Sequence, residues 1–202
     1  MAKRGSRMGM KGTIDFSSVD GFDTYLLGLP GVKQLVVDGS TRIIYVNSDC
    51  IIPIMLHIKL NQELKFTALL DIWASDNLGK DKRFEVNYMV LSVYLSFRVI
   101  IRTEITEGEG LQTVTNLFSS AGWLEREVWD MFGILFFGNT DLRRILTDYG
   151  FEGHPLRKDF PVSGFVEVRY DDGCKRVVYE PIEVAQEYRS FQFTNPWKKE
   201  NE

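Results

Sequence analysis

The alternation of hydrophobic and polar residues predicts paired β-strands in the part of the chain that precedes Asp141. Five runs carry strand patterns: residues 32–37, 41–47, 66–74, 84–90 and 97–105. An Asp-Gly pair at 38–39 separates the first two runs, which is typical of a tight hairpin turn. In the last two runs, hydrophobic residues occupy every second position, the period of a strand with one buried face.

Hydrophobic residues at helical spacing predict helices between and after these strands. A helix around Ile51 to Ile58 follows the cap-like pair Ser48-Asp49, and a short helical pattern covers residues 111–118. A third helix presents one apolar stripe, and Gly133 is its expected terminator. The stripe consists of Leu124, Val128, Met131 and Leu135. The polar segment 76–83 should be an exposed loop.

The order of these elements predicts an α+β fold. The strands come in pairs instead of alternating strictly with helices, so we expect a mixed or antiparallel sheet of about four strands with helices packed on it. A basic N-terminal tail (residues 1–14) should precede the α+β domain (15–140), and an extended C-terminal segment (141–202) should follow it.

The C-terminal segment differs in composition from the domain. It carries four prolines after residue 150, no long helical period, and aromatic residues set singly among charges. Such a segment cannot easily build its own core, yet it is too aromatic for a solvated tail. We expect it to lie along a partner protein, since buried aromatic residues carry much of the affinity of interfaces. The alternative is that it wraps back over its own domain.

Composition excludes several classes of protein. The chain has 202 residues, of which 44% are hydrophobic and 26% charged, with a net charge of −4. This usage is that of an ordinary globular protein, and it lacks the positive field that nucleic-acid binding requires. The longest apolar stretches, 51–56 and 88–97, are far shorter than the roughly 20 residues of a membrane span. We expect neither nucleic-acid binding nor a direct membrane span.

The sequence offers little for cofactor or covalent chemistry. Cys50 and Cys174 are the only cysteines, too few for a disulfide framework or a cluster cage, and they point to a reducing compartment. Gly108-Glu109-Gly110 lacks a third glycine and places a carboxylate where a phosphate would sit, which disfavours a dinucleotide site. No motif of a covalent nucleophile occurs. We therefore expect no catalytic, cofactor-binding or metal-binding residue.

His154 carries the main alternative. Asp148, Glu152 and Asp159 are near it in sequence and could share a cation with it. A free-standing metal-assisted or acid–base enzyme that uses His154, Asp148 and Glu152 is thus one competing hypothesis, and a generic α+β adaptor module is another. His57 is interpreted as a core-edge or surface histidine.

A dense run of charges around the third helix predicts ion pairs. Glu125 and Glu127 are about 200° apart around a helix and cannot converge on one substrate atom. We therefore expect these two acids and Asp130 to pair with arginines instead. Arg143 and Arg144 supply guanidinium groups suited to carboxylates. An ion-pair cluster should therefore join this helix to the start of the C-terminal segment.

Two of these stretches carry a family signature. Residues 125–133 and 141–161 closely resemble the signature of the thirty-kilodalton subunit family of respiratory complex I, NADH:ubiquinone oxidoreductase, in its mitochondrial and close bacterial branch. The likeness is weaker but colinear over residues 20–122. The signature and interface residues are Glu125, Arg126, Glu127, Trp129, Asp130, Asp141, Arg143, Arg144, Asp148, His154, Arg157, Lys158, Asp159 and Trp197.

The resemblance implies a structural role. The chain would be a core subunit of the hydrophilic arm of mitochondrial complex I, on the matrix side of the inner membrane, packed chiefly against the forty-nine-kilodalton subunit. FMN, the iron–sulfur clusters and ubiquinone would belong to neighbouring subunits. Asn139-Thr140 replaces the His-Pro usual in the family, so we expect a different path for the loop before Asp141. The short basic N-terminal stretch is no full targeting presequence, which fits organellar encoding or a processed product.

Overall fold

The computed structural model describes residues 19–39, 41–186, 189–191, 193 and 197. The expected basic tail of residues 1–14 lies outside these residues. The chain divides into two compact units, residues 1–160 and 161–202. The first unit thus ends at Phe160, whereas the sequence placed a boundary after residue 140.

A five-stranded mixed sheet forms the centre of the first unit. Its strands are β1 (Val32–Asp38), β2 (Thr41–Val46), β3 (Phe66–Asp76), β4 (Phe84–Ser92) and β5 (Phe97–Ile105), and their spatial order is β1-β2-β5-β4-β3. The β1–β2, β3–β4 and β4–β5 pairs are antiparallel, and β2 runs parallel to β5. The expected α+β class is confirmed, with five strands in place of about four.

In the described part of the chain, three α-helices accompany the sheet: α1 (Val19–Leu27), α2 (Ile51–Leu60) and α3 (Ala121–Phe132). A 3₁₀ turn, η1 (Ser48–Cys50), precedes α2, and Gly133 ends α3 with a φ of 76°, the left-handed conformation that glycine adopts at helix ends. These observations confirm the helices expected around Ile51 and Leu124. No helix among the described residues is long and apolar enough to cross a membrane.

The helix expected at residues 111–118 is wrong. Residues Gly110–Gln112 form strand β6, which pairs in parallel with β7 (Leu135–Phe137). The N–H of Thr113 donates to the carbonyl of Phe137 at 2.9 Å, and the N–H of Val114 donates to Glu125. Pairing with β7 holds residues 110–113 in an extended conformation, and only a single turn follows at residues 114–118.

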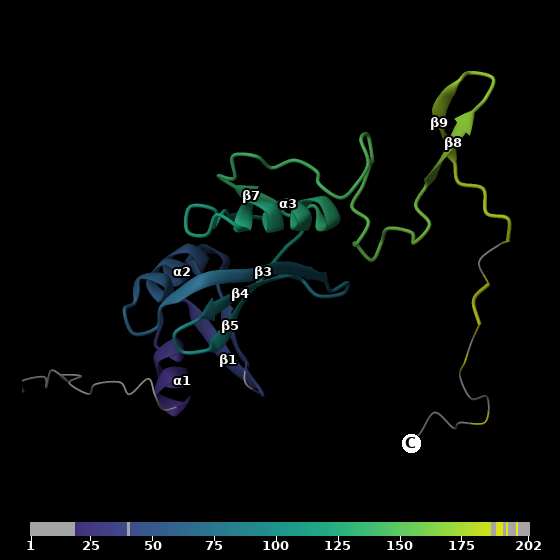
Figure 1. The fold of residues 1–202 in the computed structure, drawn as a ribbon. Coiled ribbons are helices and arrows are strands. Elements are labelled where there is room, and N and C mark those ends of the chain that lie inside the picture. Colours follow the sequence, from purple (N-terminus) through teal and green to yellow (C-terminus); the bar gives the residue numbers. More distant parts are fainter. Residues whose placement is uncertain (1–18, 40, 187–188, 192, 194–196, 198–202) are drawn as a thin grey trace, which may run out of the picture. The chain divides into compact units, whose positions relative to one another are not determined.

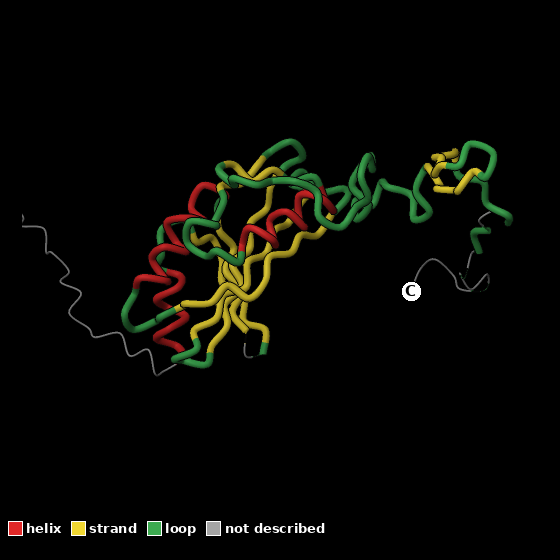
Figure 2. The backbone as a smooth tube through the Cα atoms, turned by 45° about the horizontal axis from the view of Figure 1, so that its top comes forward, coloured by secondary structure: helices red, strands yellow, loops and turns green. Residues whose placement is uncertain are grey.

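One face of the sheet carries the core. Strand register places Ile72, Tyr88 and Ile101 on the same face in adjacent strands, and all three are buried. Phe22 of α1 packs against Phe66 and Phe97 from this side. Figure 1 shows α2 and α3 beside β3, and Figure 2 shows the strands as one twisted layer with helices next to it. The helices therefore cover the apolar face that the alternation pattern predicted.

The second unit contains an antiparallel hairpin that the sequence analysis did not anticipate. Strands β8 (Val166–Asp171) and β9 (Arg176–Pro181) pair in register from Val166 opposite Pro181 to Asp171 opposite Arg176. The description of residues 141–202 as one extended segment therefore needs correction. Residues 141–160 belong to the first unit, and part of the remainder is a β-hairpin.

Candidate functional site

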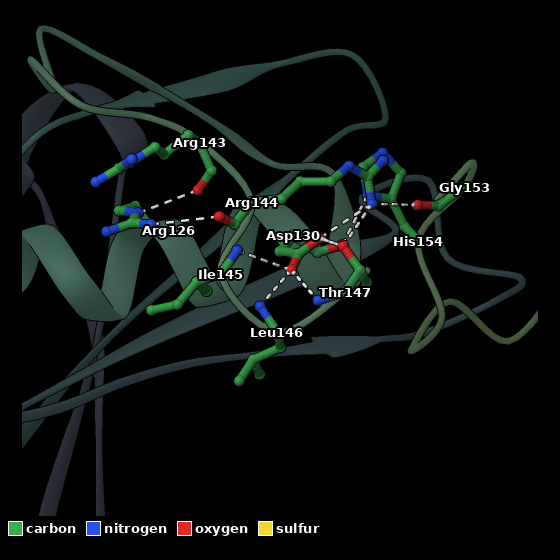
Figure 3. Close-up of polar contacts among 9 residues, drawn as sticks. All are labelled: Arg126, Asp130, Arg143, Arg144, Ile145, Leu146, Thr147, Gly153 and His154. Carbon is green, nitrogen blue, oxygen red and sulfur yellow. Dashed lines mark hydrogen bonds and ion pairs between the residues drawn. The ribbon is translucent and has the colours of Figure 1, made fainter. Parts of the chain in front are cut away.

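The carboxylate of Asp130 is the centre of the site (Figure 3). It lies on α3 with an exposed fraction of 0%. The backbone N–H groups of Ile145, Leu146 and Thr147 donate to its Oδ2 at 3.1, 2.9 and 3.0 Å. The Thr147 hydroxyl donates to Oδ1 at 2.8 Å, and Arg144 pairs with Oδ1 at 3.0 Å. One side chain thus holds a run of irregular backbone against the helix.

These donors determine the protonation of Asp130. Burial alone would raise the pKa of this carboxyl, but the hydrogen bonds from Thr147, Leu146 and Ile145 outweigh burial and lower the pKa to about 2. The group is therefore an ionised structural acceptor at neutral pH. It has no proton to give and no open position for a substrate, so its environment indicates an anchor and not an acid–base catalyst.

Two arginines extend this anchor. Arg144 also donates to the carbonyl of Gly153 at 2.9 Å, and its guanidinium lies 5.6 Å from the ring centroid of Trp129. Arg126 donates to the carbonyls of Arg143 and Arg144 at 3.1 and 3.3 Å. The ion-pair cluster expected between this helix and the segment after it is present. We call residues 141–160 the docked segment.

The neighbouring acids behave differently from expectation. Glu125 is fully buried and pairs with none of the described arginines. It accepts hydrogen bonds from the Thr113 hydroxyl, the Val114 N–H and the Asn139 amide, at 2.7, 2.8 and 2.8 Å. The expected pairing of Glu125 with an arginine was therefore wrong. The Glu125 side chain contacts the residues that follow β6, whereas Arg144 binds α3 at Asp130. Glu127 is exposed and forms no ion pair with any described residue.

Asn139 organises the loop before the docked segment. Its amide nitrogen donates to Glu125, and its amide oxygen accepts the N–H of Asp141 at 3.0 Å. Asp141 pairs with Arg143 at 3.1 Å and lies 3.9 Å from Arg126. The asparagine therefore ties this loop to α3 by a neutral side chain. A different loop path from the rest of the family stays a prediction.

The far end of the docked segment is held by a second ionic cluster. Arg157 donates to the carbonyl of Phe132 at 2.6 Å and pairs with Glu107 at 2.8 Å. The N–H of Lys158 donates to Asp76 at 2.9 Å, and Asp159 pairs with Arg83 at 3.1 Å. Three signature residues thus bind within the chain, to the end of the sheet and of α3.

Sequence reasoning missed the partners in this cluster. Arg83 donates two hydrogen bonds of 2.8 Å to the carboxylate of Asp76 and also pairs with Glu107 at 2.9 Å. Asp76 is 3% exposed. The available signal was that oppositely charged residues end the loop 76–83 and an acid opens the turn 107–110. The segment 76–83 was interpreted only as an exposed loop, and Gly108-Glu109-Gly110 only as a poor match to a dinucleotide site.

His154 does not gather a metal site. Its Nδ1 lies 3.0 Å from the carbonyl oxygen of Asp130, and its ring meets Trp129 edge to face with centroids 6.4 Å apart. Asp148 and Glu152 are exposed. Within the described part of the chain, no group of three histidine, cysteine or acidic residues could hold a metal ion. The described residues therefore do not form the metal site that the competing enzyme hypothesis needs.

A match to a known family decides the identity. Residues 44–166 match the family described as respiratory-chain NADH dehydrogenase, 30 Kd subunit. The chain belongs to this family. The matched stretch of this thirty-kilodalton subunit family begins within β2 and includes β3, β4, β5, α3 and the whole docked segment. The chain is therefore a subunit of the respiratory complex that transfers electrons from NADH to quinone.

Individual relatives agree with this family. NADH dehydrogenase (ubiquinone) iron-sulfur protein 3 of Beta trigyna is 53% identical over 155 residues, which cover 77% of this chain and 81% of the relative. A bacterial relative, an NADH-quinone oxidoreductase subunit of Paramagnetospirillum magneticum, is 51% identical over 153 residues, or 76% and 77% of the two chains.

A solved structure shares the fold of this subunit family. It is a chain of the membrane-bound sulfane sulfur reductase, an archaeal respiratory membrane complex. Its TM-score is 0.61 at 27% identity, and the match covers 70% of this chain and 85% of that chain. The same fold thus occurs in a second type of respiratory assembly.

The name of the Beta trigyna relative mentions iron–sulfur. A cluster usually takes about four cysteine ligands, whereas this sequence has two cysteines. Cys50 lies in η1, and Cys174 lies in the turn between β8 and β9. These two cysteines do not supply the ligand set of a cluster.

Proposed function

We propose that the chain is a structural core subunit of the peripheral arm of mitochondrial complex I, on the matrix side of the inner membrane. It packs chiefly against the forty-nine-kilodalton subunit and binds no cofactor itself. FMN, iron–sulfur clusters and ubiquinone belong to its neighbours, which it holds in register. Electron transfer and quinone reduction need a fixed geometry between reacting groups, which a rigid cofactor-free subunit can supply.

The observation that carries this proposal is the orientation of the docked segment. Arg144 and Arg157 pair with Asp130 and Glu107, and the backbone N–H of Lys158 donates to Asp76. By contrast, Leu146, Tyr149 and Leu156 are 61%, 96% and 55% exposed. Apolar residues projecting from a well-anchored backbone are typical of a surface that a partner protein covers. Trp123 of α3 is exposed as well.

The β8–β9 hairpin supports a partner for the second unit. Strand register places five large hydrophobic residues on one face, all more than half exposed: Val166, Val168, Tyr170, Val177 and Tyr179. The opposite face carries the Arg169–Glu180 ion pair at 2.5 Å. A lone two-stranded hairpin is marginally stable in water, and an apolar face of this kind gains stability when another surface covers it.

Paired variants of the hairpin test the contact with the forty-nine-kilodalton subunit. Val168→Asp places a charge on the apolar face, and Glu167→Gln changes the opposite face as a matched control. In cells that assemble the complex, Val168→Asp should reduce co-purification of that subunit with this chain, while Glu167→Gln should not. Unchanged co-purification in Val168→Asp would contradict a partner on this face and favour a hairpin that folds over its own chain.

Two further measurements address location and cofactors. In mitochondria with a ruptured outer membrane, the chain should resist added protease until the inner membrane is opened. The full chain purified alone should contain no stoichiometric iron or other metal. Cleavage before the inner membrane is opened would exclude the matrix side, and stoichiometric metal would revive the enzyme hypothesis at His154.

A further inference from the structure

Glu125 is a buried acid that no charged side chain of the described residues neutralises. Its carboxylate is 0% exposed, and its hydrogen-bond donors are a hydroxyl, a backbone N–H and an amide, all of them neutral. No described arginine, lysine or histidine forms an ion pair with it. Burial disfavours the charged form of such a group and raises its pKa, although the three hydrogen bonds act in the opposite direction.

A chain of hydroxyl groups leads away from this acid. The Thr113 hydroxyl lies 2.7 Å from Glu125 Oε2, and the hydroxyl oxygens of Thr113 and Thr115 are 2.9 Å apart, with either one able to donate. Glu125 and Thr113 are buried, whereas Thr115 is partly exposed. The hydrogen-bonded chain therefore leads from the buried carboxylate to a residue that is partly accessible to solvent.

We infer that Glu125 is a proton-binding site inside the fold, and that it exchanges its proton with water through the hydroxyls of Thr113 and Thr115. A hydroxyl can donate and accept at once, which a proton path requires of each member. This inference rests on the contacts around Glu125 and does not depend on the proposed partner.

The transfer balances without another reactant. In the ionised state, Thr115 donates to Thr113, and Thr113 donates to Oε2 of Glu125. A hydronium ion gives a proton to the Thr115 oxygen, the former Thr115 proton passes to Thr113, and the former Thr113 proton passes to Oε2. The products are water and a neutral carboxylic acid that donates back to Thr113. Each threonine ends with one proton, and its hydroxyl points the other way along the chain.

The surroundings allow this change without opening the fold. The Val114 N–H donates to Oε1, and the Asn139 amide donates to Oε2, and an oxygen of a neutral carboxyl can still accept these bonds. Proton uptake should therefore change only the direction in which the hydroxyls of Thr113 and Thr115 donate their hydrogen bonds.

The other titratable and charged groups near Glu125 either bind another residue or stay protonated. Tyr88 of β4 is fully buried, and its hydroxyl has no hydrogen-bond partner among the described residues. Burial and then the charge of Glu125 raise the pKa of Tyr88 far above neutrality. On α3, Arg126 and Asp130 bind the docked segment, and Asp141 pairs with Arg143. Glu125 is thus the acid in this neighbourhood whose charge no described residue neutralises.

A carboxyl titration tests the site. In the full chain with ¹³C-labelled glutamate carboxyls, Glu125→Gln identifies the Glu125 resonance, and exposed Glu127 on the same helix is the reference. The midpoint of Glu125 should lie at a higher pH than that of Glu127. A midpoint at or below that of Glu127, in a chain that remains folded, would overturn the inference.

The rate of proton uptake tests the path. After a rapid drop in pH, the infrared carboxyl band that Glu125→Gln removes should appear in a fast phase in the parent chain. Thr115→Val should lose this fast phase and Thr115→Ser should keep it, since both fill a partly exposed position and only serine retains a hydroxyl. Uptake in Thr115→Val as fast as in the parent would overturn the proposed path.

Discussion

At the scale of single residues, adjacent arginines have opposite surroundings. The side chain of Arg144 is 26% exposed and contacts Asp130, Gly153 and Thr147, whereas that of Arg143 is 70% exposed and bonds only to Asp141 among the described side chains. Arg144→Ala should lower the free energy of unfolding by about 2 kcal/mol, because it removes hydrogen bonds to a buried charge.

Arg143→Ala is the matched control for that prediction. It should leave the urea unfolding midpoint of the full chain nearly unchanged, since an exposed pair contributes little. Equal losses of stability in the two variants would show that the anchor at Asp130 is not what holds the docked segment.

The pH dependence of stability should depend on Asp130. Its pKa is about 2 in the folded chain and close to the ordinary 3.8 when unfolded. Between these values the unfolded state binds more protons, so acid favours unfolding. The stabilisation is complete above about pH 4 and declines as the pH falls toward 2, by about 2 kcal/mol. Urea titrations across this range should show that slope, and Asp130→Asn should flatten it.

Residue-level prediction succeeded where charges were close in sequence. Asp130 and Arg144 are fourteen positions apart, and the prediction joined them because the arginines directly follow the helix. Asp76 and Lys158 are separated by 82 positions, and no local pattern indicates their contact. Glu125 was misassigned because spacing around a helix tells which side chains share a face, but not which element that face meets.

At the scale of elements, the end of α3 depends on one glycine. Gly133 has a φ of 76°, and a Cβ there would lie 2.6 Å from side-chain atoms of His154 and Arg157. Gly133→Ala should therefore cost about 1 kcal/mol in backbone strain and about 1–3 kcal/mol more for displacing the docked segment.

Gly79→Ala separates the two costs. Gly79 also has a positive φ, 95°, but a Cβ there would meet no atom within 4 Å. Urea unfolding should show a clearly larger loss for Gly133→Ala than for Gly79→Ala. Equal losses would mean that the backbone conformation alone matters and that the close approach of His154 and Arg157 does not.

The docked segment should stabilise the first unit over its whole length. A chain ending at Gly150 lacks Arg157 and Lys158, and therefore loses their bonds to Phe132, Glu107 and Asp76. A chain ending at Val162 keeps them. The shorter chain should be less stable by about 3 kcal/mol, measured by urea unfolding. Identical midpoints would contradict a structural role for residues 151–160.

The sequence predicted helices and strands correctly where tertiary contacts agree with the local spacing of hydrophobic residues. The runs at 84–90 and 97–105 alternate cleanly and became central strands. The segment at 111–118 has helical spacing, but pairing of β6 with β7 prevails over it. The β8–β9 hairpin also alternates, yet the prolines and scattered aromatic residues of its surroundings led to an extended segment.

At the scale of the whole molecule, key charged side chains bind within the chain, whereas many large apolar side chains are exposed to solvent. The signature residues Asp130, Arg144 and Arg157 stabilise the first unit from within, and the apolar side chains of the docked segment and the hairpin remain outside. The sequence predicted an α+β domain followed by an interaction segment. It could not locate the unit boundary at Phe160, because that boundary depends on the long-range cluster at Asp76 and Arg83.

The role of this chain as a subunit of an NADH-oxidising assembly can be tested directly. The measurement is native purification in mild detergent through a tag on this chain, followed by NADH:quinone activity and mass spectrometry of the co-purifying proteins. We expect a large active complex that carries flavin and iron–sulfur clusters and includes the forty-nine-kilodalton subunit. Recovery of this 23.3 kDa chain alone, with no companions and no quinone reductase activity, would contradict that role.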